Sequence, residues 1–453
     1  MDTSSPKKLR PETLPPKPSF EQFRKRAKEL ARANGTKLTE AQFTIARWYG
    51  FPSWPKLRAY VQRVEGHGPE MEHPYHADAK YYGERALGLL ASAEDKTPDA
   101  VKAFERHQQP LTRDGARAVV ALEHGFPSWR VLRTHVSALA ESGEPFARAY
   151  KLIEAHDVDA LARLVDKFPE LVKARGTNGN DLLGMAGATH DERLTRVLLE
   201  RGADPARGNI HGWTPLHQAA YANLPVLMRM LLDAGAPVDV SGRGDGGTPL
   251  AVALFWGNRE AAEMLAGRGL TPGNLRVAAG LGNLELLDEL ITPQGKLASE
   301  AGAHRAFYRP HSGFPFWKPS DDVAEIRDEA LAWAARNNRA AAIEVLARRG
   351  ANLDADVYRG TPLIWAAFAG KADAARKLVE LGADVDIRGT FGGHGHGSGV
   401  TALHLAAQND SVDVLKVLLD AGADRSVRDN LFGSTAAGWA EHGGSAAALE
   451  LLA

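Results

Sequence analysis

The sequence predicts an all-α protein, an α-solenoid with β-hairpin loops that follows a small helical domain. A seven-residue phrase of the pattern Thr-Pro-Leu-His-x-Ala-Ala occurs in four variants, at residues 214–220, 248–254, 361–367 and 401–407. Each variant is followed by an apolar stretch with helical periodicity. The turn glycines Gly202, Gly235 and Gly269 lie 33 and 34 residues apart. A fixed period of this length is typical of helical pairs stacked into a solenoid.

This phrase and its period resemble the ankyrin repeat, whose signature is T-P-L-H-x-A at a period near 33 residues. The resemblance covers about 300 residues of the chain. It implies a solenoid whose concave face binds a partner protein, with no catalytic residue and no cofactor. We therefore expect a non-catalytic interaction scaffold or adaptor, and the resemblance leaves the partner open because one scaffold serves many functions.

Composition and spacing divide the chain into three parts. Residues 1–18 are rich in proline and lysine and predict a disordered tail. Residues 19–140 predict a helical domain, and residues 146–453 predict a solenoid of about nine helical pairs. Two departures interrupt the period: an inserted loop at about 292–328 and an enlarged hairpin at 389–399.

The helical domain contains one motif twice. The segments 46–61 and 121–136 share Gly-Phe-Pro-Ser-Trp and are offset by 75 residues. Glycine can end a helix in the left-handed conformation and serine can cap the next one, so each copy predicts an α-hairpin. The motif resembles an N-terminal segment that precedes ankyrin repeats in some bacterial proteins.

Composition limits the classes of function. The formal net charge is −1, close to neutral. The chain has no cysteine, which excludes disulfides, a thiolate nucleophile and a zinc–thiolate site. No run of about 18 apolar residues or apolar signal region is present, so we expect a cytoplasmic protein without a membrane span.

The candidate partner-binding residues are those that the ankyrin resemblance places at hairpin tips and after each Ala-Ala pair. Many of them are aromatic, as in binding hot spots. They are Ile210, His211, Trp213, Tyr221, Phe255, Trp256, Val357, Tyr358, Phe368, Leu431, Phe432 and His442. The alternative is that these large side chains shield neighbouring hairpins.

Other aromatic and histidine residues predict structural roles. Trp333, Trp365 and Trp439 share one column of the repeat, where the family commonly has leucine, and we expect them to pack between adjacent repeats. His217 and His404 occupy the histidine position of the phrase, where the resemblance implies a hydrogen bond within the repeat.

The insertion is the most distinctive segment. Its prolines and glycine disfavour regular structure, and its aromatic residues argue against disorder. The candidate binding residues within it are Phe307, Tyr308, Arg309, His311, Phe316 and Trp317. A pocket beneath this loop, in an enzyme or in a receptor for a small molecule or metal, is the first alternative to the scaffold.

Metal binding has four weak candidates, His304 and His311 in the insertion and His394 and His396 in the glycine-rich hairpin. Their spacing matches no known motif, so we predict no metal site. A weaker alternative is nucleic-acid binding by the N-terminal module. Residues 1–65 hold fourteen Lys/Arg and six Asp/Glu, a net charge of +8, although solvated helix faces also explain this.

Overall fold

The structure is a computed structural model. It describes residues 19–49, 53–55, 57–58, 61, 72–73, 79–94, 98–123, 128–142, 145–176, 180–209, 212–268, 273–307, 319–389 and 398–453. The described residues form two compact units. Unit 1 takes residues from 1–90, 102–218 and 229–236, and unit 2 takes residues from 91–101, 219–228 and 237–453.

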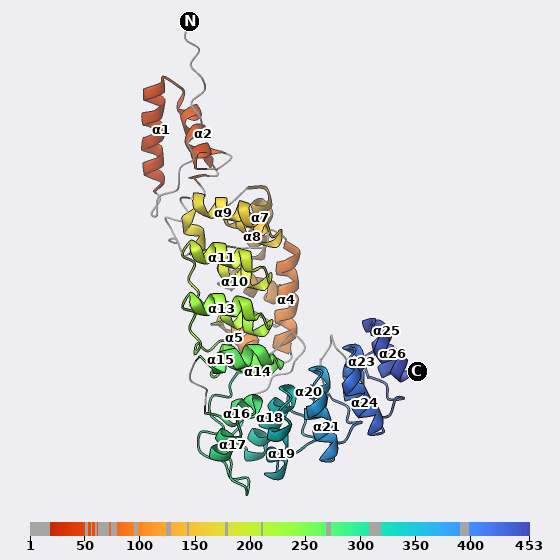
Figure 1. Cartoon of the computed structure of the whole chain (residues 1–453). Coiled ribbons are helices and arrows are strands. Elements are labelled where there is room, and N and C mark those ends of the chain that lie inside the picture. Colours follow the sequence, from red (N-terminus) through yellow and green to blue (C-terminus); the bar gives the residue numbers. More distant parts are fainter. Residues whose placement is uncertain are drawn as a thin grey trace. The chain divides into compact units, whose positions relative to one another are not determined.

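Six helices are described before the solenoid (Figure 1). They are α1 (Phe20–Asn34), α2 (Leu38–Trp48), α4 (Ala79–Glu94), α5 (Pro98–Arg106), α6 (Arg113–Glu123) and α7 (Trp129–Ser142). The Ser128 hydroxyl accepts a hydrogen bond from the Val131 N–H at 3.4 Å, so this serine caps α7 as the repeated motif predicts. The short strand β1 (Glu72–His73) pairs in parallel with β2 (Arg175–Gly176).

Nine helical pairs follow in the described residues, in agreement with the number predicted from the period. They are α8 (Pro145–Glu154) with α9 (Val158–Lys167), α10 (Leu182–Ala188) with α11 (Glu192–Glu200), α12 (Pro215–Tyr221) with α13 (Pro225–Asp233), α14 (Pro249–Trp256) with α15 (Arg259–Ala266), α16 (Leu275–Leu281) with α17 (Leu284–Leu290), α18 (Val323–Arg336) with α19 (Ala340–Arg348), α20 (Pro362–Phe368) with α21 (Ala372–Glu380), α23 (Ala402–Gln408) with α24 (Val412–Asp420), and α25 (Ala436–Gly443) with α26 (Ala446–Leu452). A 3-10 turn, η1 (Pro169–Val172), follows α9.

In the four pairs that carry the repeated phrase, the first helix begins at the second residue of the phrase. Thr248 and Thr361 cap α14 and α20 through their side chains, and proline occupies the first helical position, where its missing N–H costs nothing. The predicted histidine bonds are confirmed. The Nδ1 atoms of His217 and His404 lie 2.8 and 2.9 Å from the hydroxyls of Thr214 and Thr401, respectively.

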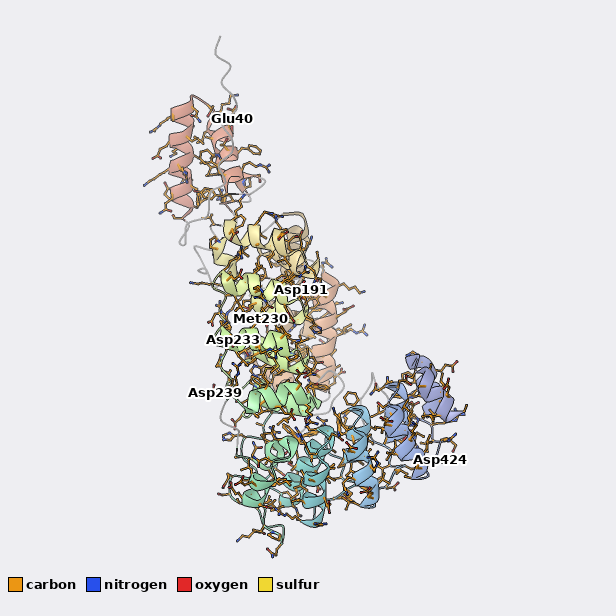
Figure 2. All side chains as sticks on the ribbon, viewed as in Figure 1. Glu40, Asp191, Met230, Asp233, Asp239 and Asp424 are labelled. Atoms are coloured by element: carbon orange, nitrogen blue, oxygen red, sulfur yellow. The ribbon has the colours of Figure 1, made fainter. Side chains whose placement is uncertain are left out.

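The pairs stack in two layers within each unit. In unit 2 the first helices α16, α18, α20, α23 and α25 contact one another in that order, and the second helices α17, α19, α21, α24 and α26 do the same. Side chains fill the space between these layers (Figure 2). Adjacent hairpins are linked as well: the N–H of Asp424 donates to the side-chain carboxylate of Asp386 at 2.9 Å.

The tryptophan column lies in the core, as predicted. Trp333 and Trp365 are fully buried and Trp439 is nearly so. No helix of the described residues is long and apolar enough to cross a membrane.

The inserted loop is shorter than the predicted 292–328. Residues 323–328 belong to α18, whose N-terminus is capped by Asp322 through the N–H groups of Ala324 and Glu325. The predicted boundary placed these residues in the loop because the apolar part of the helix starts only later. The base of the enlarged hairpin is closed by a bridge between Gly389 and Val400, and its residues 390–397 lie outside the described residues.

Candidate functional site

Three half-buried aromatic side chains of unit 2 form a continuous row, which we call the aromatic row: Tyr221, Trp256 and Phe368. The rings of Tyr221 and Trp256 meet edge to face with centroids 5.3 Å apart, and Trp256 lies 6.5 Å from Phe368. They come from the C-terminal ends of α12, α14 and α20. Tyr221 and Phe368 directly follow the Ala-Ala pair, and Trp256 is the second residue after its equivalent, Ala253-Leu254. Ring pairs at these separations attract one another beyond the effect of buried area alone.

A buried layer supports the aromatic row. Phe255 and Tyr358 are 1% and 3% exposed, and their ring centroids lie 5.5 Å apart. The Arg336 guanidinium lies 3.4 Å from the centroid of Trp365 and 4.1 Å from that of Phe255. Sequence reasoning placed Phe255 and Tyr358 among the partner-binding residues, but both lie in the interior. The surface offered at this place comes from the aromatic row.

Side chains of later repeats hold the backbone under the row. The Asn258 amide donates to the carbonyl of Tyr221 at 2.8 Å, and the Asn409 amide donates to that of Phe368 at 3.0 Å. Arg336 donates to the carbonyl of Phe255, the residue before Trp256. Because these bonds end the helices in fixed positions, the rings are organised before any partner arrives.

The remaining candidates lie in different environments. Trp213 and Val357 are buried, so they offer little area. Leu431, Phe432 and His442 are exposed, the first two by 45% and 66%. Ile210 and His211 lie outside the described residues.

Leu431 and Phe432 stand on a rigid turn built around Asp429. The buried Asp429 carboxylate accepts hydrogen bonds from the N–H groups of Leu431, Phe432 and Ser434 and from the Trp439 indole, at 2.6–3.0 Å. Burial by itself would raise the pKa of Asp429, but these bonds hold it below its usual value. The turn therefore presents two apolar side chains at fixed positions.

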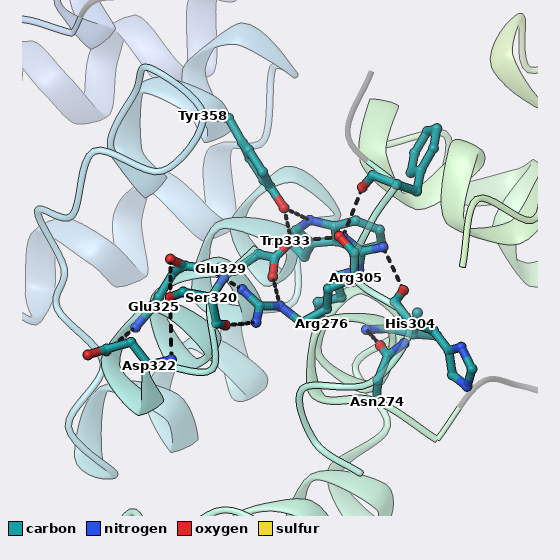
Figure 3. Close-up of polar contacts among 12 residues, drawn as sticks. Asn274, Arg276, His304, Arg305, Ser320, Asp322, Glu325, Glu329, Trp333 and Tyr358 are labelled. Atoms are coloured by element: carbon teal, nitrogen blue, oxygen red, sulfur yellow. Dashed lines mark hydrogen bonds and ion pairs between the residues drawn. The ribbon is translucent and has the colours of Figure 1, made fainter. Parts of the chain in front are cut away.

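A cluster of buried charges lies between α16 and α18 and contacts Tyr358 of the buried layer (Figure 3). The Glu329 carboxylate is fully buried and accepts from the Arg276 guanidinium at 2.8 Å, and also from Arg305 and from the Tyr358 hydroxyl. Arg276 lies 4.5 Å from the centroid of Trp333. Burial lowers the pKa of Arg276, and the nearby Glu329 carboxylate opposes that shift.

The charge cluster fixes both ends of the insertion. Arg276 donates to the backbone carbonyls of His304, Arg305 and Phe307 at 3.1–3.3 Å, which holds the end of the first described stretch. Arg305 donates to the carbonyl of Ser320 at 2.8 Å and to Glu325 at 2.7 Å, which holds the start of the second. The two described stretches on either side of residues 308–318 are thus held by one ionic cluster.

Sequence reasoning missed this cluster, although a signal was present. When the Ala-Ala pairs of the repeats are aligned, Arg276 occupies the histidine position of the phrase and Glu329 the threonine position. A charged side chain in a core column of a repeat requires a buried partner of opposite charge. The partner comes from the next repeat, across the insertion, and the one-repeat pattern does not reveal it.

The candidates in the insertion are only partly described. Phe307 is fully buried, and its ring centroid lies 5.9 Å from that of Phe255. Tyr308, Arg309, His311, Phe316 and Trp317 lie outside the described residues, as do His394 and His396 of the enlarged hairpin.

His304 is exposed and lies beside a pocket of about 320 Å³. Its Nδ1 is 2.9 Å from the Asp245 carboxylate, and Asp239 and Ser241 of the hairpin after α13 also line the pocket (Figure 2 labels Asp239). Among the residues that the structure describes, no three His, Asp or Glu side chains lie close enough together to hold a metal ion. The alternative of an enzyme or receptor pocket at the insertion stays a prediction.

Some arginine side chains of the basic N-terminal module contact other side chains of the same module. The Arg26 guanidinium lies 5.5 Å from the centroid of Trp48, and Arg58 lies 5.5 Å from that of Phe20. Arg24 pairs with Glu21 at 2.8 Å. Nucleic-acid binding by this module stays a prediction as well.

Comparison with protein families gives matches over most of the solenoid. Residues 154–273 and 275–389 each match the family described as ankyrin repeats in three copies. Residues 398–430 match the single ankyrin repeat.

Several characterised proteins are similar to parts of the chain. An ankyrin repeat domain-containing protein, SAT10, from Stachybotrys chartarum is 28% identical over 51% of this chain and 13% of its own length. Protein PhlB from Serratia liquefaciens is 35% identical over 20% of this chain and 39% of its own. Human ankyrin repeat and SOCS box protein 11 is 37% identical over 19% of this chain and 25% of its own length. The chain thus spans well under half of the length of each relative.

Proposed function

Because this chain belongs to the ankyrin-repeat family, we propose that it is a non-catalytic scaffold that binds a partner protein through the aromatic row. The continuity of Tyr221, Trp256 and Phe368 carries this proposal: neighbouring rings lie 5.3 and 6.5 Å apart. Large aromatic side chains at the centre of an interface supply much of its binding free energy. The row is also held in place from below, so little conformational entropy is lost when a partner binds.

The turn at Asp429 is a second contact point in this proposal. Leu431 and Phe432 are exposed on it while its backbone is fixed by the buried carboxylate. Exposed apolar side chains on a rigid support are typical of surfaces that bind other proteins.

The test is affinity capture from the native lysate with the full chain, followed by mass spectrometry of the captured proteins. The comparison variant carries Tyr221→Ala, Trp256→Ala and Phe368→Ala. Phe255 and Tyr358 stay intact because their loss would open a cavity in the core. Since each aromatic anchor contributes about 2 kcal/mol or more, the triple variant should bind the captured partner at least about 100-fold more weakly.

A matched control removes apolar surface elsewhere in the same unit. Val226, Leu284 and Val323 are also exposed apolar residues, and the triple replacement of these residues by alanine should leave capture unchanged. Circular dichroism must show that both variants keep the helical content of the wild type. Equal binding by the wild type and the aromatic-row variant would refute the proposal.

A further inference from the structure

The first helix of the second pair, α10, has a glycine at the histidine position of the repeated phrase. It begins with Asp181 as its cap and has Gly184 where α12 has His217. A Cβ atom at Gly184 would meet its nearest neighbours, oxygens of Asp181 and Asn180, at 3.5 and 3.6 Å, which are ordinary contact distances. The fold therefore leaves open the space that the His217 side chain fills in α12.

Gly438 of α25 shows that a glycine at this position does not by itself leave empty space. It occupies the same position of the repeat, three residues after the capping Thr435. A Cβ atom there would lie 2.2 Å from the Ser434 hydroxyl oxygen, so that space is already filled. At Gly184 nothing takes the place of the missing side chain.

A pocket of about 240 Å³ adjoins Gly184 within unit 1. Tyr150 and Glu154 of α8 line it, and Met185 of α10 and Trp213 also contribute. Pockets for drug-sized ligands usually measure about 300–1,000 Å³, so this one fits a single side chain or a fragment of similar size. Among its lining residues there is no lysine or arginine.

The charge at this pocket is negative. Glu154 lines it and is exposed, and Asp181, which is 3% exposed, lies between the lining residue Asn180 and the helix that carries Gly184. The Asp181 Oδ1 accepts the Gly184 N–H at 2.9 Å, whereas Oδ2 is buried without a hydrogen-bond partner in the described residues.

The environment of Asp181 favours an additional positive charge. Burial raises the pKa of Asp181 to about 6, although the Gly184 N–H and the charges of Arg207 and Arg175 act in the opposite direction and Asp204 acts in the same one. The carboxylate is thus incompletely compensated, and a further cation nearby would stabilise it.

We propose that this pocket receives the guanidinium group of an arginine side chain of the partner protein. A guanidinium is planar, stacks on aromatic rings and binds carboxylates through two parallel N–H groups, which suits Tyr150 and Glu154. Unit 2 of the same chain packs Arg336 on Trp365 in this way. A lysine ammonium is strongly hydrated and offers no flat surface to the rings.

This inference rests on the proposed partner-binding role and adds a chemical requirement to it. The lining residues of the pocket belong to unit 1, and none of them is a residue of the aromatic row. Binding of a small arginine derivative can therefore be measured without a partner protein, and the two proposals can fail independently.

The probe is N-acetyl-L-arginine amide, added to the full chain labelled with 5-fluorotryptophan. Fluorine NMR follows the Trp213 resonance, which is assigned by its absence in a Trp213→Phe variant. We expect a saturable shift with the arginine derivative. We expect none with the citrulline derivative, which has the same shape without the charge. The variant with alanine at the three aromatic-row positions should bind the probe as the wild type does.

Two variants test the site itself. Gly184→Ile introduces the residue that α20 has at this position, Ile364, and should abolish the shift by filling the pocket. Glu154→Gln changes an exposed side chain, which keeps the fold intact, and should weaken binding at least about tenfold, whereas Glu200→Gln on α11 should not. Equal binding of the arginine and citrulline derivatives, tighter binding of the lysine derivative, or wild-type affinity in Glu154→Gln would each overturn the proposal.

Discussion

Asp181 takes the place of the threonine that starts other first helices of the repeats, and it brings a negative charge into the interior. Its pKa is raised to about 6 from the ordinary value of 3.8, chiefly by burial. A group whose pKa is raised on folding stabilises the protein at pH below its unfolded value. That contribution is lost as pH rises through the folded value. Between pH 4 and 8 the charge of Asp181 should therefore reduce stability.

Asp181→Asn should be more stable than the wild type at pH 8, by roughly 1–3 kcal/mol, and nearly equal to it at pH 4. Asparagine caps a helix as well as aspartate does, so the capping bond to Gly184 is kept. Urea unfolding at both pH values measures the difference. Asp157→Asn is the control, because Asp157 also caps a helix, α9, but is exposed. A pH-independent difference for Asp181→Asn would contradict the assignment.

The sequence predicts the burial and hydrogen bonding of some side chains but not of others. The burial of Trp333 and the hydrogen bond of His404 follow from their columns in the repeat, since every unit places those columns at the same interface. Phe255 and Tyr358 were predicted at the binding face, yet they are covered by Phe307 and Arg336 from other repeats. Burial that depends on residues beyond the next repeat cannot be read from the period of one unit.

The hairpin between α13 and α14 shows how closely an element can be fitted to its neighbour. Gly246 has a φ of 77°, and a Cβ atom there would lie 1.9 Å from the carbonyl oxygen of His304. The N–H of Phe307 donates to the carbonyl of Asp245 at 3.0 Å. The hairpin and the start of the insertion thus pack backbone to backbone.

Gly246→Ala should therefore destabilise the protein by roughly 2–4 kcal/mol, through a left-handed backbone that disfavours a side chain and through the clash with His304. Gly235→Ala is the matched control. Its φ is 90° but no atom lies within 4 Å of the added Cβ, so we expect only the backbone cost of about 1 kcal/mol. Thermal and urea unfolding of both variants measure the two costs. Equal losses would show that the hairpin can move away.

At the level of elements the sequence predicts the helical pairs well and the insertion poorly. Each pair carries its own start and stop signals, such as Thr361 at the cap of α20 and Gly382 after α21. The start of α18 carries no repeated phrase, because Glu329 stands where threonine is expected. Its true start depends on the cap at Asp322, seven residues before Glu329.

Within each unit, the described helical pairs are held together mainly by contacts between neighbouring pairs. In such arrays the effect of a local change spreads through the nearest interfaces rather than through one common core. The two compact units of this chain provide a way to observe this, since the charge cluster belongs to unit 2 alone.

Glu329→Gln leaves Arg276 and Arg305 buried without their carboxylate, and should destabilise unit 2 by about 3–5 kcal/mol. Hydrogen exchange followed by mass spectrometry should show faster exchange in α16, α18 and α20, with wild-type protection in α8–α11. Glu344→Gln, which affects ion pairs with Arg348 and Lys377 at the surface, should change stability by less than about 1 kcal/mol. A uniform loss of protection along the chain would mean that both units unfold as one.

The charge cluster between α16 and α18 also bears on how the chain finds its correct pairing during synthesis. A protein built from similar units risks joining helices that are not true neighbours, and such mispairing is a characteristic failure of repeat proteins. Arg276 would be buried without a counter-ion against any helix that lacks a carboxylate in the matching column, at a cost of several kcal/mol. The pairing of Arg276 with Glu329 consequently favours the packing of α16 against α18 over other helices. The cluster thereby favours the correct order of the repeats across the insertion.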